Sequence, residues 1–258
     1  MRMEDLDAER SRAVYADAAY EDLRWLGIAW QEGPDVGGPL APYEQSRRGD
    51  FYLAAWRRLL AGGFIYPCRC SRKDLASALS APHEGADPAD DEPIYPGTCR
   101  PETGFAALRR AAPSVAETGE GHPGPVNWRF RVPDGEAIEF IDGNLGPQRF
   151  VAGVDFGDFL VWRRDGEPSY QLACVVDDAA MQITEVVRGA DLLKSTARQI
   201  LLNRALGHAD PAWFHCRLVT DSSGKRLAKR HDALSIRTLR ERGLTPEEIL
   251  SGSPPVQA

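Results

Sequence analysis

Three cysteines that lie close together in the sequence constrain the fold of this chain more than any other feature. Cys68 and Cys70 form a C-x-C pair, and Cys99 follows a segment, residues 81–93, that is rich in Ala, Pro, Asp and Glu and has little to bury. Two thiolates on a tight turn and a third that closes a core-poor loop are typical of a structural zinc site, where metal binding replaces hydrophobic burial. The alternative is three unrelated buried cysteines.

The spacing leaves the fourth zinc ligand open. His83 is a chemically ordinary choice and Tyr95 an unusual one. The two remaining cysteines, Cys174 and Cys216, are expected to be buried small hydrophobic residues. An odd count of five cysteines without an export signal fits a reducing compartment, and we expect a cytoplasmic protein.

Composition excludes several classes of protein. The chain has 258 residues, 43% of them hydrophobic and 27% charged, which excludes collagen-like, coiled-coil and wholly disordered chains. Its longest apolar run, residues 51–56, is far shorter than the roughly 20 residues of a membrane span, so no membrane partner is expected. The net charge of −7 argues against general coating of nucleic acid but is compatible with a local basic face.

Apolar spacing predicts helices on both sides of a β-rich middle. The first helix follows Ser11 and is closed by Gly27, the second covers 46–60, and Ser195 caps a third that Gly207 stops. The first two helices carry apolar stripes, formed by Tyr15, Ala19, Leu23 and Leu26 and by Tyr52, Ala55, Trp56, Leu59 and Leu60.

Short strands are expected between these helices. They are 64–66, 127–132, 138–141, 159–163 and a buried strand that ends at Val186-Val187. Ser71-x-x-Asp74 has the signature of a capping box, and Asp165-Gly166 signals a hairpin turn. The order of elements favours an α/β sheet domain with an insertion and a small C-terminal piece.

Polar residues follow two apolar runs of this sheet domain. Asp177-Asp178 and Arg188 come where buried strands are expected to end, which is where open α/β sheets place their ligand sites. Arg188 is suited to a bidentate clamp on a carboxylate, or it pairs with a structural Asp.

Two charged segments and the histidines have competing interpretations. Glu4-Asp5-Leu6-Asp7 is either a solvated acidic terminus or a strand end that presents carboxylates to an ammonium or hydroxyl group. Residues 225–230 hold four cations and are either a solvated basic loop or a loop that neutralises a polyphosphate leaving group; the P-loop spacing is absent. His83, His122, His208, His215 and His231 form no ligand spacing, and each is expected to be a surface or core residue.

Together these segments resemble the glutamyl-type class I aminoacyl-tRNA synthetases, and the resemblance covers nearly the whole chain. It is carried by five motifs in order: Arg2-Met-Glu-Asp-Leu-Asp7, Leu23-Arg-Trp-Leu-Gly27, Pro168-Ser-Tyr170 through Asp177-Asp178, Ile183-Thr through Arg188-Gly189, and Arg226-Leu-Ala-Lys-Arg230, which is similar to the KMSKS-type loop.

A short subgroup of this family fits better than the discriminating glutamyl-tRNA synthetases, which carry a large anticodon-binding domain after that loop. Only 28 residues follow Arg230, and the zinc knuckle is similar to that of the subgroup. Its members activate glutamate with ATP and attach it to the queuosine base at the wobble position of tRNA(Asp). The resemblance also implies Tyr95 as the fourth zinc ligand, beside the three thiolates.

The resemblance implies a fold and a domain division. The fold is a Rossmann-like parallel sheet with an inserted α+β zinc-containing subdomain and a small C-terminal helical and loop region. The catalytic domain would comprise 1–63 and 158–208. The insertion would be 64–157, with its zinc knuckle at 68–99, and the C-terminal region 209–258 would include the KMSKS-type loop.

The resemblance further implies roles for individual residues. Glu4 would hold the glutamate ammonium group, Tyr170 would line the pocket, and Arg188 would clamp the side-chain carboxylate. Lys229 would be catalytic and would bind ATP, which enters with Mg²⁺, together with Arg226 and Arg230. We expect a monomer.

Two departures from the family pattern shape the expectations. The first strand and the HIGH-type motif of the family should precede Arg2, so we expect a truncated start. In the loop, Arg226 replaces a Lys and Ala228 replaces a Ser. The alternatives are a fragment of a glutamyl-tRNA synthetase, or a non-catalytic, zinc-stabilised module that binds RNA or an amino acid.

Overall fold

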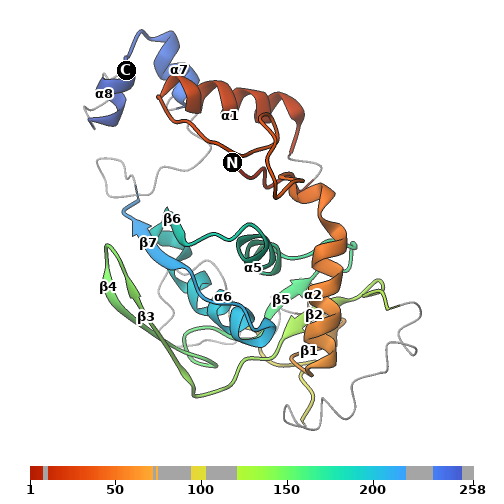
Figure 1. The fold of residues 1–258 in the computed structure, drawn as a ribbon. Coiled ribbons are helices and arrows are strands. Elements are labelled where there is room, and N and C mark those ends of the chain that lie inside the picture. The colour runs from red at the N-terminus through yellow and green to blue at the C-terminus, as the bar shows by residue number, and fades with distance from the viewer. Residues whose placement is uncertain (8–10, 72–73, 75–93, 103–120, 219–234, 252–258) are drawn as a thin grey trace. The chain divides into compact units, whose positions relative to one another are not determined.

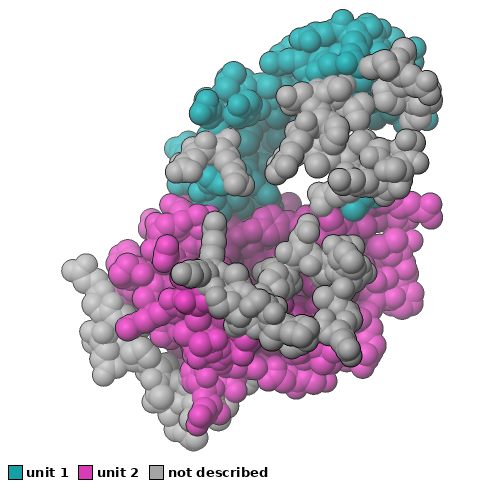
Figure 2. All heavy atoms as spheres, turned by 180° about the vertical axis from the view of Figure 1, so that it is seen from behind, with its two compact units in different colours: residues 1–47, 218–258 teal, residues 48–217 magenta. Residues whose placement is uncertain are grey.

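The computed structural model describes residues 1–7, 11–71, 74, 94–102, 121–218 and 235–251. The chain divides into two compact units, which Figure 2 shows in different colours: residues 1–47 with 218–258, and residues 48–217. Each unit is described by itself below, and the four-segment division expected from the sequence stays a prediction.

The larger unit contains a four-stranded mixed sheet in the order β4-β3-β7-β6 (Figure 1). β3 (Ala137–Asp142) and β4 (Gly146–Val151) form an antiparallel hairpin. β7 (Ala212–Cys216) is parallel to β3 on one side and to β6 (Glu185–Gly189) on the other. Parallel neighbours need a crossover connection, and the helix that follows β6 supplies it. The α/β class expected from the sequence is confirmed.

A second, three-stranded sheet in the same unit is antiparallel throughout. Its order is β1-β2-β5, with bounds Ile65–Cys68, Asn127–Phe130 and Phe159–Trp162. The Phe130 and Phe159 rings stack across β2 and β5, with centroids 5.2 Å apart. The strands expected at 64–66, 127–132, 138–141 and 159–163 correspond to β1, β2, β3 and β5, whereas β4 and β7 had not been predicted.

Three helices form the apolar core of the larger unit. They are α2 (Gly49–Ala61), α5 (Tyr170–Ala180) and α6 (Leu193–Leu206), and α5 contacts both of the others as well as β5. The stripe predicted for α2 is confirmed, because all five of its residues are buried. The ring of Trp56 in this stripe meets Trp128 edge to face, with centroids 5.0 Å apart.

The apolar run before Asp177 is a helix, so the prediction that a buried strand ends there is wrong. Ser169 caps this helix, α5, and its side chain accepts a hydrogen bond from the Leu172 N–H. A short run that is apolar on every side fits a buried helix as well as a buried strand, and periodicity alone cannot separate them. Asp177 lies inside the helix and pairs with Arg48 (2.6 Å), both side chains being almost fully buried.

Exposure differs from the expectation at two positions of the sheet. Cys216 was expected to be buried but is exposed, because β7 alternates and its buried positions are Trp213 and His215. Val187 was also expected to be buried, yet it is 60% exposed on β6, an outer strand. Cys174 is buried, as expected.

Local signals at element ends are mostly confirmed. Gly207 adopts a left-handed conformation (φ 68°) at the end of α6, as expected. Ser195 does not cap that helix, which begins at Leu193 after a 3-10 turn, Ala190–Leu192. Ser71 and Asp74 exchange the two hydrogen bonds of a capping box (2.7 and 3.2 Å), while the loop expected at 81–93 lies outside the described residues.

The smaller unit contains α1 (Ala13–Trp25), a 3-10 turn (Gln45–Arg47), α7 (Ile236–Glu241) and α8 (Pro246–Leu250). Near its start, Met3 forms a parallel bridge with Glu44. Within the part of the chain that the structure describes, no helix is long and apolar enough to cross a membrane.

The apolar stripe predicted for α1 does not form a buried face. No residue of this helix is buried, and Tyr15 is 61% exposed. Ion pairs join α1 to α7, for example Arg240 to Asp22 at 3.0 Å, and Arg240 also lies over the Trp25 ring. Gly27 follows the helix in a left-handed conformation (φ 79°), as expected.

Candidate metal and ligand sites

The three clustered cysteines come together at the end of β1. Cys68 is the last residue of the strand and Cys70 lies two residues further on, while Cys99 lies in a turn at 97–100. Their Sγ atoms all lie within 4.8 Å of one another. The prediction that these cysteines form a cluster is therefore confirmed, and metal binding itself stays a proposal.

The distances in this cluster fit a tetrahedral zinc ion. With Zn–S bonds of about 2.3 Å and Zn–O bonds of about 2.0 Å, tetrahedral angles place sulfur atoms about 3.8 Å apart and a sulfur and an oxygen about 3.5 Å apart. The Sγ atoms of Cys70 and Cys99 are 3.5 Å apart. The Tyr95 hydroxyl lies 3.5 Å from Cys68 Sγ and 3.6 Å from Cys70 Sγ, which is the place of a fourth ligand. His83 lies outside the described residues.

Burial and hydrogen bonds shift the pKa values of three of these groups, Cys99, Tyr95 and Cys70. Burial alone raises the pKa of Cys99, but the Arg69 N–H and neighbouring side chains hold it at about 7. Burial, followed by the neighbouring thiols, raises the pKa of Tyr95 well above its ordinary value, and burial also raises the pKa of Cys70. Both groups can become anionic ligands only when a cation compensates their charge.

A buried arginine lies against the cluster, and it had not been predicted. Arg129, on β2, donates from Nε to Cys68 Sγ (3.4 Å) and from Nη1 to the Asp158 carbonyl (2.9 Å). Successive side chains of a strand point to opposite faces, so Arg129 would face away from Trp128 and Phe130, yet only 7% of it is exposed. Its positive charge partly balances the negative charge that thiolates and a phenolate bring to one ion.

A second polar cluster lies at the carboxyl ends of the parallel strands. Arg188 and His215 are paired in the β6–β7 register, and Asp142, the last residue of β3, is paired with Trp213. Three neighbouring strands thus place Asp142, His215 and Arg188 in one row, at the edge where open α/β sheets bind ligands. Arg188 therefore occupies the kind of position that the sequence predicted for it.

The other residues expected to bind glutamate lie in different parts of the chain. Tyr170 is the first residue of α5 in the larger unit and is 39% exposed. Glu4 lies in the smaller unit, immediately after the Met3 bridge, and accepts a hydrogen bond from Arg2 (3.0 Å). The next carboxylate, Asp5, accepts bonds from the backbone and hydroxyl of Ser46 and is thus a structural group.

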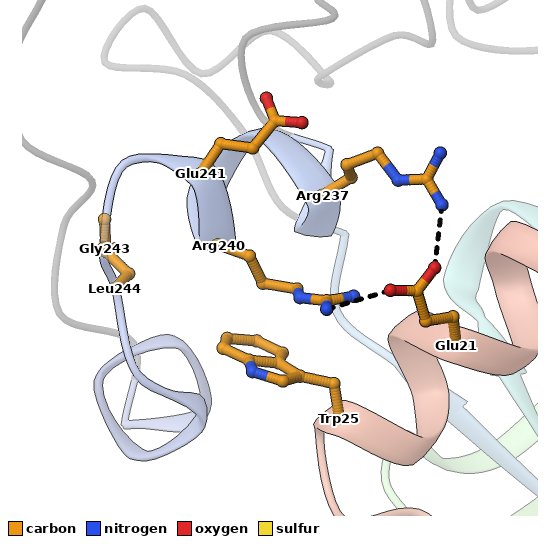
Figure 3. Close-up of a pocket in the computed structure, with 7 residues that line it drawn as sticks. All are labelled: Glu21, Trp25, Arg237, Arg240, Glu241, Gly243 and Leu244. Carbon is orange, nitrogen blue, oxygen red and sulfur yellow. Dashed lines mark hydrogen bonds and ion pairs between the residues drawn. The ribbon is translucent and has the colours of Figure 1, made fainter.

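The expected ATP-binding cations, Lys229, Arg226 and Arg230, lie outside the described residues. A pocket in the smaller unit contains none of the expected site residues (Figure 3). There, both Arg237 and Arg240 approach Glu21 (3.2 and 3.0 Å), and the Arg240 guanidinium lies over the Trp25 ring. Its arginines are therefore neutralised within the pocket. Its lining residues are Glu21, Trp25, Arg237, Arg240, Glu241, Gly243 and Leu244.

The partners of Arg188 were not predicted from the sequence: its guanidinium donates to His215 Nε2 (3.2 Å) and to the Thr196 hydroxyl (2.6 Å). His215 was expected to be a surface or core residue, and it is a core residue with 0% exposure. Asp142 and Thr196 had drawn no attention. The signal for Asp142 was a carboxylate between a strand and a Gly-Asn turn, but nothing local indicated which strand lies beside it.

Comparisons with known proteins show which family the chain is similar to. The family model for the catalytic domain of class I tRNA synthetases (E and Q) matches residues 1–253. A glutamyl-Q tRNA(Asp) synthetase from Symbiobacterium thermophilum is 48% identical over 97% of this chain and 73% of the relative. A glutamate–tRNA ligase from Nitrosococcus oceani is 43% identical over 96% of this chain and 50% of the relative.

A solved structure shows the same fold. The crystal structure of glutamate–tRNA synthetase from Elizabethkingia anophelis matches 89% of this chain with a TM-score of 0.70 and 27% identity, over 45% of that protein. The chain thus spans about half of the glutamate–tRNA ligases and nearly three-quarters of the glutamyl-Q relative. The resemblance seen in the sequence motifs is confirmed: the chain belongs to the class I tRNA synthetases for glutamate and glutamine, as a ligase-type catalytic domain.

Proposed function

We propose that this chain activates glutamate with ATP to form glutamyl-adenylate and transfers the glutamyl group to the queuosine base at the wobble position of tRNA(Asp). The observation that carries the proposal is the 48% identity, over almost the whole chain, to a relative named for that reaction. The position of Arg188 at the ligand-binding edge of the sheet supports an anionic amino acid as substrate.

Three residues are assigned to the binding of glutamate. Arg188 binds the side-chain carboxylate of glutamate, Tyr170 lines the pocket, and Glu4 holds the ammonium group by charge. An arginine offers two parallel N–H donors to a carboxylate, and a carboxylate is the natural partner of an ammonium group.

Activation needs charge neutralisation more than covalent chemistry from the protein. The glutamate α-carboxylate attacks the α-phosphorus of ATP in line, an acyl–phosphate bond forms, and pyrophosphate leaves with the electron pair of the broken bond. Lys229, with Arg226 and Arg230, stabilises the charge that develops on the leaving phosphates. Mg²⁺, which accompanies ATP in this family, adds positive charge at the same phosphates.

The zinc site is assigned a structural role. Cys68, Cys70, Cys99 and the phenolate of Tyr95 hold the ion and tie the end of β1 to residues 95–99, a part of the chain with few apolar groups of its own. The spacing of the donor atoms supports this assignment.

We also propose that the protein is cytoplasmic, where its tRNA substrate is, and monomeric. The division of the chain into domains is part of the proposal: catalytic segments 1–63 and 158–208, an insertion at 64–157 and a C-terminal region at 209–258.

Glutamate-dependent ATP–pyrophosphate exchange by the zinc-loaded 258-residue chain, without tRNA, tests the activation step. Exchange that needs glutamate supports the proposal. Absence of exchange, both in this chain and in a chain extended by the sequence encoded immediately upstream, would contradict it and favour a binding module. The acceptor is tested by comparing tRNA(Asp) with and without queuosine. Transfer to the 3′ end instead of the modified base would favour a glutamate–tRNA ligase activity.

A further inference from the structure

Neutral groups hold the charged side chain of Arg188. Its Nε donates to His215 Nε2 (3.2 Å) and its Nη2 donates to the Thr196 hydroxyl (2.6 Å). The guanidinium carbon lies 5.1 Å from the centre of the Trp213 ring. These three contacts fix the plane and direction of the guanidinium without cancelling its charge.

The acceptor that Arg188 uses on His215 depends on Asp142. His215 Nδ1 lies 2.6 Å from the Asp142 carboxylate, and both side chains are fully buried. Burial alone would raise the pKa of Asp142, but bonds from the His215 ring and from the Leu145, Asn144 and His215 N–H groups lower it to about 2. An ionised Asp142 can only accept, so the ring proton lies on Nδ1 and Nε2 keeps its lone pair for Arg188.

The two other protonation states of the His215 ring conflict with the geometry. A proton on His215 Nε2 would face the Nε–H of Arg188 at 3.2 Å, which brings two donors together. A doubly protonated ring would add a like charge beside the guanidinium. The Thr196 hydroxyl lies 3.1 Å from the same His215 nitrogen, so Arg188, His215 and Thr196 each contact the other two.

Arg188 differs in its charge balance from Arg48, a buried arginine of the same unit. Arg48 pairs directly with the Asp177 carboxylate. Within the described residues, no carboxylate lies within ion-pair distance of Arg188, and Nη1 has no hydrogen-bond acceptor. The guanidinium therefore keeps both an uncompensated charge and one donating edge for a ligand.

We propose that Asp142 and His215 are positioning residues that hold Arg188 in the orientation and charge state that select an anionic substrate side chain over a neutral amide. This inference rests on the proposed function and deepens it, because it names what distinguishes glutamate from glutamine. A guanidinium already paired with a protein carboxylate would bind a substrate carboxylate only weakly, because its charge is already balanced. Held by neutral acceptors, it favours a carboxylate over an amide of nearly the same shape.

The kinetic test uses three variants of the zinc-loaded chain in the exchange assay. His215→Leu removes the acceptor, His215→Gln retains an acceptor near the place of Nε2, and His122→Leu changes an exposed histidine as a control. We expect His215→Leu to raise the KM for glutamate on the order of 10- to 100-fold, to change kcat much less, and to narrow the preference for glutamate over glutamine. His215→Gln should restore most of the KM, and His122→Leu should match the parent chain. Unchanged KM and preference in His215→Leu would overturn the proposal.

A spectroscopic test separates this proposal from the proposed function. In ¹⁵N NMR spectra, His215 should show a neutral ring protonated at Nδ1, and the Nε–H of Arg188 should be protected from exchange with water. That protection should be lost in His215→Leu and kept in His215→Gln. A ring protonated at Nε2, or at both nitrogens, would contradict the positioning role even if the chain activates glutamate. The expected spectra without glutamate-dependent exchange would instead contradict the proposed function alone.

Discussion

The guanidinium carbon of Arg129 lies 3.9 Å from the centre of the Tyr95 ring. The same side chain donates to Cys68 Sγ, so one buried cation contacts two of the four groups proposed to hold zinc. A cation at this place offsets the negative charge that thiolates and a phenolate bring to one ion, and thereby favours the metal-bound state.

Replacing Arg129 should weaken zinc binding. We expect Arg129→Gln to lower zinc affinity about tenfold, because the uncharged amide no longer balances the thiolates and the phenolate. Competition with a chromophoric chelator at neutral pH measures the affinity. Arg149→Gln, which removes only an exposed ion pair with Glu139, should leave the affinity unchanged and serves as the control. Equal affinities of the two variants would show that Arg129 plays no part in metal binding.

Exchanging the proposed fourth ligand should identify it. In Tyr95→Phe, the phenolate is lost and the Cys99 N–H loses its acceptor (2.8 Å), so we expect weaker metal binding and a changed absorption spectrum of the cobalt-substituted protein. His83→Ala should leave both unchanged. The reverse pattern would assign the site to His83, the alternative that the spacing left open.

The Asp142 carboxylate should make stability depend on acidic pH. Its pKa is lowered from an ordinary value of 3.8 to about 2 in the folded chain. Its contribution is therefore fully present above about pH 4 and is lost as the pH falls toward 2, by about 2 kcal/mol in the free energy of unfolding. Urea titrations between pH 5 and 2 should show a shallower slope for Asp142→Asn than for the parent chain, whereas Asp165→Asn, at an exposed turn, should keep the parental slope. Identical slopes for all three would refute this assignment.

Replacing only one member of the buried ion pair between Arg48 and Asp177 should destabilise the folded chain. Asp177→Leu leaves the Arg48 charge buried without its carboxylate, and we expect a loss of about 3–5 kcal/mol in the free energy of unfolding. The double variant with Arg48→Met should recover part of that loss. Tyr52→Phe, which removes the hydrogen bond from the Tyr52 hydroxyl to Asp177 (2.9 Å), should cost about 1 kcal/mol. Urea denaturation gives all three values, and a double variant less stable than Asp177→Leu would argue against this account.

Removing the positive charge of Lys229 should slow glutamate-dependent ATP–pyrophosphate exchange. If Lys229 neutralises the leaving pyrophosphate, Lys229→Ala should lower the rate of glutamate-dependent exchange on the order of 100-fold. Lys73→Ala removes a lysine with no assigned role and should exchange at the parental rate. Equal rates for both variants would remove the proposed role of the loop.

Much of this protein followed from the sequence because local spacing encodes it. The α2 stripe at Tyr52, Trp56 and Leu59 is buried as its helical period predicts. Five motifs in the right order, taken together, identified the family. The three cysteines could be grouped because their chemistry and order in the chain restrict them to few arrangements. Where a run was apolar on all sides, as before Asp177, the spacing could not separate helix from strand.

The partners of the functional groups were decided only by the tertiary structure. Asp142, His215 and Arg188 lie in one row because β3, β7 and β6 are neighbours in a particular register, and no local pattern specifies which distant strands pair. Likewise, nothing in the local sequence marks Arg129 as buried, whereas in the structure it is a buried cation beside Cys68 and the Tyr95 ring. The sequence by itself determined which residues can do the chemistry. Contacts between segments far apart in the chain decided how those residues are oriented and charged.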